Sequence, residues 1–150
     1  KEVHSVDTSE KAIELARENR RINGFKVEAK DFHIEDVFEF LRKTDSLYGF
    51  IILDPPAFAK RRTDVVQACR GYKDINRIAI QKILPRGLLF TFSCSYFVDE
   101  NLFQKVIFQA AGEAQRKVSI IHRHRQAFDH PLNIFHPESE YLKGFLLYVE

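Results

Sequence analysis

Two residues of this chain, Asp54 and Cys94, carry side chains that could take part in catalysis, a carboxylate and a thiol. Each follows an apolar run that predicts a buried strand. Cys94 lies between Ser93 and Ser95, and cysteine is strongly nucleophilic even when only a few per cent of it is thiolate near neutral pH. Cys94 is therefore a candidate nucleophile. A free cysteine is more often a small buried hydrophobe, and this alternative stays open.

The run at residues 54–58 reads Asp-Pro-Pro-Ala-Phe. Its two prolines make the backbone rigid just past the strand and hold the Asp54 carboxylate at the strand's mouth. Phe58 can then stack on a planar base, an interaction that contributes ~1–3 kcal/mol per base. An acid beside an aromatic ring suits recognition of a ring amino group. The structural alternative is an Asp-Pro turn followed by a core phenylalanine.

Two further acids stand where a nucleotide cofactor could be held. Asp7 ends a short β-branched run, at the position where nucleotide folds bind a ribose through its hydroxyls. Asp36, followed by Val37, could accept a hydrogen bond from an adenine amino group. Each acid has a simpler interpretation as a negative charge at a helix N-terminus.

Other residues carry no chemistry in this interpretation. Cys69 lies within an expected helix and is taken as structural. The histidines do not form a metal site, because no cysteine lies near them and they fall on a strand and in a proline-bounded loop. The chain contains no phosphate-binding Gly-rich loop, which a nucleotide cofactor normally meets after the first strand.

The composition, with 45% hydrophobic and 29% charged residues, is that of a globular protein. No apolar run reaches the roughly 20 residues that span a bilayer, and no signal peptide opens the chain. Two cysteines fit a reducing cytosol, so we expect a cytoplasmic protein that does not contact a membrane. Residues 51–86 contain eight basic against three acidic residues, and a second basic run covers residues 116–125. Both runs could hold phosphates or form a solvated face.

Strands and helices alternate along the chain. The first helix is capped by Thr8 or Ser9, stops at Gly24 and places five residues on its core-facing side: Ala12, Leu15, Ala16, Asn19 and Ile22. The predicted strands are 3–6, 27–30 (weak), 49–53 (buried on both faces), 87–93, 118–122 and 145–149. The other predicted helices are 35–43, 63–84 with an interruption at Gly71, and one that begins at Asp99; a turn occupies residues 85–87.

This alternation predicts an α/β protein with a parallel, doubly wound sheet. Ligands of such sheets bind beyond the carboxyl ends of the strands. That rule selects three places here, which are Asp7, Asp54 and the cluster around Cys94.

Several segments in this order resemble the large-subunit (23S) ribosomal RNA cytosine-5 methyltransferases, which carry an RNA-binding PUA domain ahead of a class I methyltransferase domain. The matching segments are residues 6–9, 35–38, 54–58, 69–76 (Cys-Arg-Gly-Tyr-Lys-Asp-Ile-Asn), 91–95 (Thr-Phe-Ser-Cys-Ser), 129–131 and 141–144. The resemblance implies a Rossmann-like fold, a mostly parallel twisted sheet with an antiparallel last strand, and helices on both faces.

The resemblance also implies roles for individual residues. Asp7 would hold the ribose of S-adenosylmethionine, Asp36 and Val37 its adenine, and Asp54 would lie beside both the cofactor and the cytosine. Cys94 would add to carbon 6 of that cytosine. The RNA would contact five side chains: Phe58, Lys60, Arg70, Tyr72 and Lys73. We further expect the long loop 126–143 to close over the target base.

Two features depart from the expected pattern. The chain has no methionine and opens at Lys1 on the approach to a strand, so we expect residues 1–150 to be one methyltransferase domain that lacks its N-terminal part, with the Gly-rich motif and any PUA domain upstream. Pro56 also stands where many other RNA cytosine-5 methyltransferases carry a second cysteine.

Two other functions remain open from the sequence. The same fold with an Asp-Pro-Pro-aromatic motif also serves methylation of ring or amino nitrogens, which requires no cysteine. A non-catalytic RNA-binding or ribosome-assembly module would use the same basic runs. RNA is the expected partner in each case, and a homodimer is possible.

Overall fold

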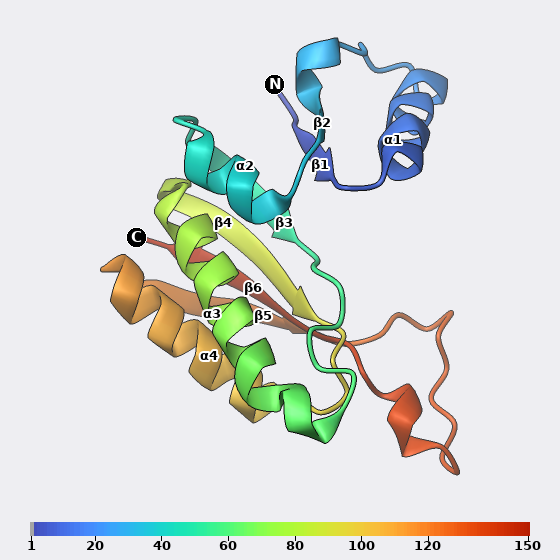
Figure 1. Cartoon of the computed structure of the whole chain (residues 1–150), viewed down its shortest axis with the longest axis vertical. Coiled ribbons are helices and arrows are strands. Elements are labelled where there is room, and N and C mark those ends of the chain that lie inside the picture. Colours follow the sequence, from blue (N-terminus) through green and yellow to red (C-terminus); the bar gives the residue numbers. More distant parts are fainter. Residues whose placement is uncertain (1) are drawn as a thin grey trace. The chain divides into compact units, whose positions relative to one another are not determined.

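The computed structural model describes residues 2–150, which form two compact units, residues 2–45 and 46–150. The first unit contains two short strands, β1 (Ser5–Asp7) and β2 (Phe32–Ile34), which pair in parallel. Between them lie α1 (Glu10–Ile22) and a short 3-10 helix, η1 (Ala29–Asp31), and α2 (Val37–Lys43) follows (Figure 1).

Helix α1 begins as predicted, because the Ser9 side chain caps it by accepting a hydrogen bond from the Ala12 amide. The predicted core face was wrong. Ile13 is the buried residue of this helix, whereas Leu15 and Ile22 are 60% and 62% exposed. On the Ile13 side of the helix, Arg20 forms an ion pair with the buried Asp31 at 2.6 Å, so this side rather than the Leu15 side packs against the unit.

The weak strand expected at residues 27–30 is not formed. The chain instead makes η1 there, and the strand follows as β2. Asp31 and Phe32 are both buried, so the packing of this turn, which local propensity does not encode, displaces the strand along the chain. Helix α2 is confirmed, with Asp36 as its N-cap.

The second unit contains a four-stranded sheet in the order β3-β4-β6-β5 (Figure 1). The strands are β3 (Tyr48–Leu53), β4 (Ile83–Ser93), β5 (Val118–His124) and β6 (Lys143–Val149), and the helices are α3 (Val65–Gln81) and α4 (Glu100–Ala114), with short 3-10 turns η2 (Arg62–Asp64) and η3 (Pro137–Ser139). Strands β3 and β4 are parallel, whereas β6 runs antiparallel to both of its neighbours, as predicted for the last strand.

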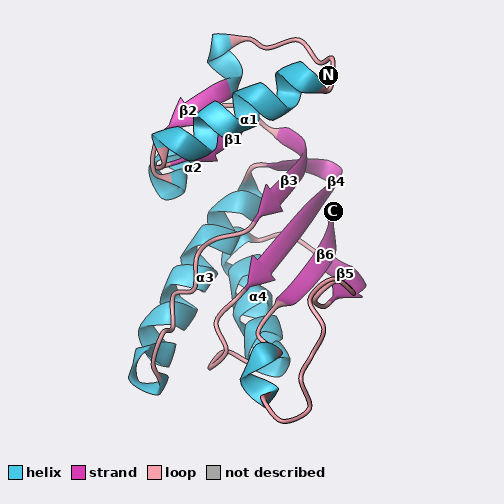
Figure 2. Cartoon of the chain, turned by 90° about the vertical axis from the view of Figure 1, so that its right-hand side faces the viewer, coloured by secondary structure: helices cyan, strands magenta, loops and turns pink. Residues whose placement is uncertain are grey.

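Helices α3 and α4 lie side by side against one face of this sheet (Figure 2). The core between them is built from fully buried side chains, among them Tyr72, Ile75, Phe103, Phe145 and Leu147. Strand β3 was expected to be buried on both faces, but Phe50 and Ile52 are 50% and 64% exposed because they alternate with Ile51 and Leu53 and point away from the face that α3 and α4 cover.

Two local predictions in this unit were also wrong. Gly71 does not interrupt the helix, since α3 runs unbroken from Val65 to Gln81. Residues 85–87 form an irregularity inside β4 rather than a separate turn: Arg86 has a φ of 66°, and the pairing with β3 moves from Ile83 to Leu88 over two residues of β3. No helix within residues 2–150 is long and apolar enough to cross a membrane.

Candidate active site

Asp54 and Cys94 lie at the same edge of the sheet in the second unit. In the parallel pair β3–β4, Leu53 is opposite Thr91, so the chain leaves both strands at neighbouring points. The Cys94 Sγ donates a weak hydrogen bond to the Pro55 carbonyl at 3.7 Å. The prediction that each motif lies just past the end of a strand is therefore confirmed, and the backbone pairing places the two motifs at one edge.

The thiol and the carboxylate influence each other electrostatically. Burial raises the pKa of the Cys94 thiol, and the negative charge of Asp54 raises this pKa further. The charge of Lys143 acts in the opposite direction. Burial also raises the pKa of the Asp54 carboxyl. In this state Cys94 is held mainly as the thiol near pH 7, so nucleophilic attack requires that its proton be removed.

Lys143, the first residue of β6, lies at the same edge of the sheet as Cys94, although it is 49 residues further along the chain. It is opposite Ser93 in the β4–β6 pairing, and its Nζ donates to the carbonyl oxygens of Ser95 at 2.6 Å and Tyr141 at 2.7 Å. Sequence reasoning did not single out this residue as functional. The only signal was its position in the matching segment 141–144.

A buried hydroxyl pair supports the loop that carries Asp54. Ser95 Oγ lies 2.9 Å from Tyr72 Oη and accepts a hydrogen bond from the Ala59 amide at 3.0 Å. The Phe58 ring packs against Tyr72 with centroids 4.5 Å apart. Tyr72 was expected to contact RNA, but it is 0% exposed, so this expectation is corrected. Its apolar ring completes the core, and its hydroxyl positions the loop.

The other predicted RNA contacts differ in accessibility. Lys60 and Arg70 are exposed and Phe58 is half-buried, so all three offer surface to a ligand. Lys73 forms an ion pair with Glu113 of α4 at 2.6 Å and is 31% exposed. The second basic run is also largely paired within the protein: Arg116 donates to the Ile83 and Glu150 carbonyls, and Arg123 pairs with Glu100.

The residues expected to hold the cofactor, Asp7, Asp36 and Val37, belong to the first unit. Asp7 ends β1, is exposed and accepts a hydrogen bond from the Ser9 amide at 2.7 Å. Asp36 Oδ1 accepts from the Phe38 and Glu39 amides, which is the helix-capping alternative for this residue. Within residues 2–150 the Oδ2 atoms of both acids accept no hydrogen bond, so each carboxylate is oriented by one oxygen and presents the other.

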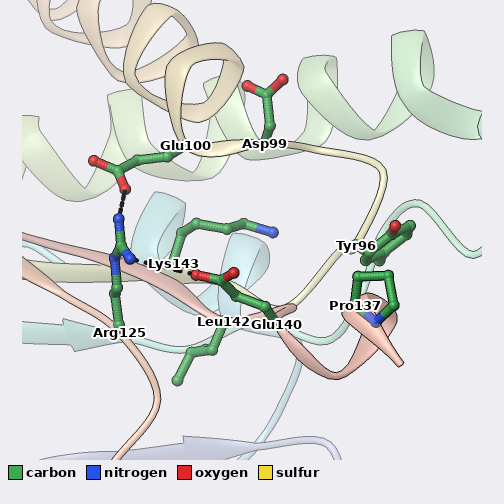
Figure 3. Close-up of a pocket in the computed structure, with 8 residues that line it drawn as sticks. All are labelled: Tyr96, Asp99, Glu100, Arg125, Pro137, Glu140, Leu142 and Lys143. Atoms are coloured by element: carbon green, nitrogen blue, oxygen red, sulfur yellow. Dashed lines mark hydrogen bonds and ion pairs between the residues drawn. The ribbon is translucent and has the colours of Figure 1, made fainter. Parts of the chain in front are cut away.

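A pocket of about 430 Å³ opens beside Lys143 (Figure 3). Asp99 borders it on one side of the lysine and Glu140 on the other, and Arg125 bridges Glu100 and Glu140 by ion pairs. The pocket walls come from the start of α4 and from the loop between β5 and β6. The remaining lining residues are Tyr96, Pro137 and Leu142.

The second cysteine and the histidines lie elsewhere. Cys69 is half-buried within α3, where burial raises its pKa. In the part of the chain that the structure describes, no group of three or more histidine, cysteine or acidic side chains could hold a metal ion.

Comparison with solved structures defines the class of fold. A proposed S-adenosylmethionine-dependent methyltransferase from Streptococcus mutans superposes with a TM-score of 0.78 at 22% identity, covering 98% of this chain and 38% of that one. A proposed methyltransferase solved with S-adenosylhomocysteine (SAH) gives the same TM-score and identity, with 98% and 39% covered. Trm5b from Pyrococcus abyssi gives 0.65 at 16% identity, with 99% and 38% covered. The chain therefore has a Rossmann-like methyltransferase fold.

Sequence relatives are more specific. The chain is 47% identical over 148 residues to ribosomal RNA large subunit methyltransferase I of Erwinia tasmaniensis, covering 97% of this chain and 37% of that protein. It is 46% identical over 152 residues to the enzyme of the same name from Photobacterium profundum, covering 99% and 38%. The chain thus spans little more than a third of the length of these relatives. No family model matches it.

Proposed function

We propose that this chain is the catalytic part of a cytoplasmic S-adenosylmethionine-dependent methyltransferase that modifies carbon 5 of a cytosine in large-subunit ribosomal RNA. The observation that carries the proposal is that Cys94 and Asp54 lie at the same edge of the sheet, where the Cys94 sulfur donates a hydrogen bond to the Pro55 carbonyl. Relatives named as large-subunit ribosomal RNA methyltransferases support the substrate.

The chemistry explains why a cysteine is needed. Carbon 5 of cytosine is too electron-poor to take a methyl group directly. When the Cys94 thiolate bonds to carbon 6, the ring becomes an enamine whose carbon 5 can attack the methyl group that S-adenosylmethionine supplies. Carbon 5 then loses its proton to a base, the ring double bond re-forms, and the thiolate is expelled.

Asp54 is suited to the cytosine side of this reaction. Burial raises the pKa of its carboxyl, which favours donation of a proton to ring N3 as negative charge develops there during addition. A contact to N3 and the exocyclic amino group would stabilise the adduct. The same carboxylate disfavours the Cys94 thiolate in the free protein, and protonation of Asp54 would remove this repulsion.

We propose that the cofactor's adenosine contacts Asp7, Asp36 and Val37 of the first unit. A carboxylate can accept two ribose hydroxyls side by side, and Asp7 is exposed and oriented by the Ser9 amide. Asp36 combines capping of α2 with an oxygen that can accept from the adenine amino group.

Three accessible side chains, Phe58, Lys60 and Arg70, are the proposed RNA contacts near the active site. Phe58 would stack on a base, and the two cations would contact phosphates. A base in a duplex would have to be unstacked to reach Cys94, at a cost of a few kcal/mol. We therefore propose a loop or a locally opened rRNA segment as the target, with the loop 126–143 closing over it.

The deciding experiment incubates the protein that contains this chain with labelled S-adenosylmethionine and large-subunit rRNA containing 5-fluorocytosine. Fluorine at carbon 5 cannot leave as a proton, so the methylated adduct stays bound to Cys94. A covalent protein–RNA complex that disappears in Cys94→Ala is the expected result. Methyl transfer to ordinary rRNA without a trapped complex would instead indicate a nitrogen acceptor. RNA binding without any transfer would indicate a non-catalytic module.

A further inference from the structure

Lys143 is buried at the active-site edge of the sheet, an unusual place for an ammonium group. Its relative exposure is 9%, and its Nζ donates to two backbone carbonyls, those of Ser95 and Tyr141. Among the described residues no carboxylate forms an ion pair with it. Burying an ammonium group is costly unless it is compensated. Two neutral carbonyls accept from two of its three N–H groups, and neither carries a charge that would neutralise the ammonium.

The unneutralised charge acts on Cys94. Burial lowers the pKa of Lys143 to about 8, and the nearby Cys94 and Asp99 partly offset this effect. The lysine is therefore mostly cationic near pH 7. Burial and Asp54 raise the pKa of the Cys94 thiol, whereas a backbone hydrogen bond to the sulfur and the charge of Lys143 lower it.

We propose that Lys143 is a positioning residue for Cys94: its ammonium holds the carbonyl of Ser95, the residue next to Cys94, and its charge stabilises the thiolate. This inference rests on the proposed function, in which Cys94 is the nucleophile. Because Nζ also donates to the Tyr141 carbonyl, Lys143 links the segment that follows β4, which carries Cys94, to the loop that precedes β6. The lysine thereby connects the nucleophile to the segment proposed to cover the base.

Several other ionisable groups face this lysine–thiol pair and set its surroundings. They come from the loop after β3, from the turn and first residues of α4, and from the loop between β5 and β6: Asp54, Tyr96, Asp99, Glu100, Arg125 and Glu140. Arg125 is occupied by Glu100 and Glu140. Within the described part of the chain, Lys143 is the cation whose charge lowers the pKa of Cys94.

The test measures how fast iodoacetamide alkylates Cys94 between pH 6 and pH 10, followed by mass spectrometry of the peptide that contains it. Neither RNA nor cofactor is needed, so the result does not depend on methyl transfer. Lys143→Met should slow alkylation of Cys94 about three- to tenfold near pH 7, since the thiolate fraction changes tenfold for each unit of pKa. The difference in Cys94 alkylation rate between wild type and Lys143→Met should become smaller above pH 8, where the wild-type lysine loses its own proton.

Two controls separate the charge from a general loss of structure. Lys105→Met removes the same charge from an exposed site on α4 and should leave the Cys94 rate within about twofold of wild type. Cys69 in the same digest is an internal reference, because unfolding would expose it and speed its alkylation. If Lys143→Met unfolds, Lys143→Gln replaces it, because glutamine keeps a donor for the carbonyls without the charge. This variant should also slow alkylation of Cys94 near pH 7.

An unchanged Cys94 profile in a folded charge-removing variant would overturn the proposal. Lys143→Arg keeps the charge and should keep the Cys94 rate closer to wild type than Lys143→Gln does; equal slowing in both would assign Lys143 a purely structural role and also overturn the proposal. Failure of the proposed function has a different signature, because a protein with the expected alkylation profile would then trap no 5-fluorocytosine RNA.

Discussion

The two cysteines of this chain have similar burial but very different neighbours. Burial raises the pKa of both thiols. Cys69 lies in the middle of α3, and burial is the sole cause of its shift. Cys94 follows the end of β4, where Asp54 and Lys143 add opposing charges and the Pro55 carbonyl accepts from the sulfur. The reactivity of each cysteine therefore depends on the charged and hydrogen-bonding groups near its thiol, because burial alone raises the thiol pKa and makes the thiol inert.

The largest expected effect separates the two cysteines directly. Cys94→Ala should lower methyl transfer to rRNA by at least about a thousandfold, because removing a covalent nucleophile removes the route through the adduct. Cys69→Ala should stay within about twofold of wild type. Single-turnover transfer from labelled S-adenosylmethionine measures both. Equal losses in the two variants would mean that Cys94 has no special role.

The next effect concerns Asp54, which should act on the substrate and on Cys94 in opposite directions. Asp54→Asn should slow methyl transfer about a hundredfold, as expected when an acid–base group is removed. The same change removes a negative charge that raises the pKa of Cys94, so alkylation of this thiol near pH 7 should become about two- to fivefold faster. Alkylation of Cys69 should not change. A slower Cys94 alkylation would contradict the assigned electrostatics.

A third prediction tests the packing behind Cys94. Ser95→Ala leaves the buried Tyr72 hydroxyl and the Ala59 amide without this partner, at a cost of about 1–3 kcal/mol in the free energy of unfolding. Denaturant titration measures this loss. Ser119→Ala, on the exposed side of β5, is the matched control and should change the stability by less than about 0.5 kcal/mol. Equal stabilities would show that the hydroxyl pair contributes nothing.

The smallest effect concerns RNA binding on α3, beside Cys69. Arg70→Ala should weaken rRNA binding about three- to tenfold and reduce the slope of log affinity against log salt by about 1, because one phosphate contact is lost. Lys73→Ala should have less effect, since Glu113 already engages this lysine. Affinities measured over a range of salt concentrations distinguish the two. If the affinity of the wild-type protein for rRNA did not change with salt concentration, RNA binding at this surface would be contradicted.

Much of the site could be predicted because it is local in sequence. Apolar runs that end in Asp54 and near Cys94 predict strands, and the parallel β3–β4 pairing then places both residues at one edge. The caps at Ser9 and Asp36 were equally predictable, since a side-chain oxygen two or three residues before an amide is sufficient to cap it. The antiparallel last strand followed from the resemblance.

The sequence by itself thus determined the strand-helix alternation, the two motifs at the strand ends and the cysteine worth testing, because these depend on residues close together in the chain. Only the tertiary structure decided that Tyr72 belongs to the core, that Ile13 rather than Leu15 faces inward, and that Lys143 reaches Ser95. These outcomes depend on contacts between residues far apart in sequence, where packing and burial outweigh local pattern.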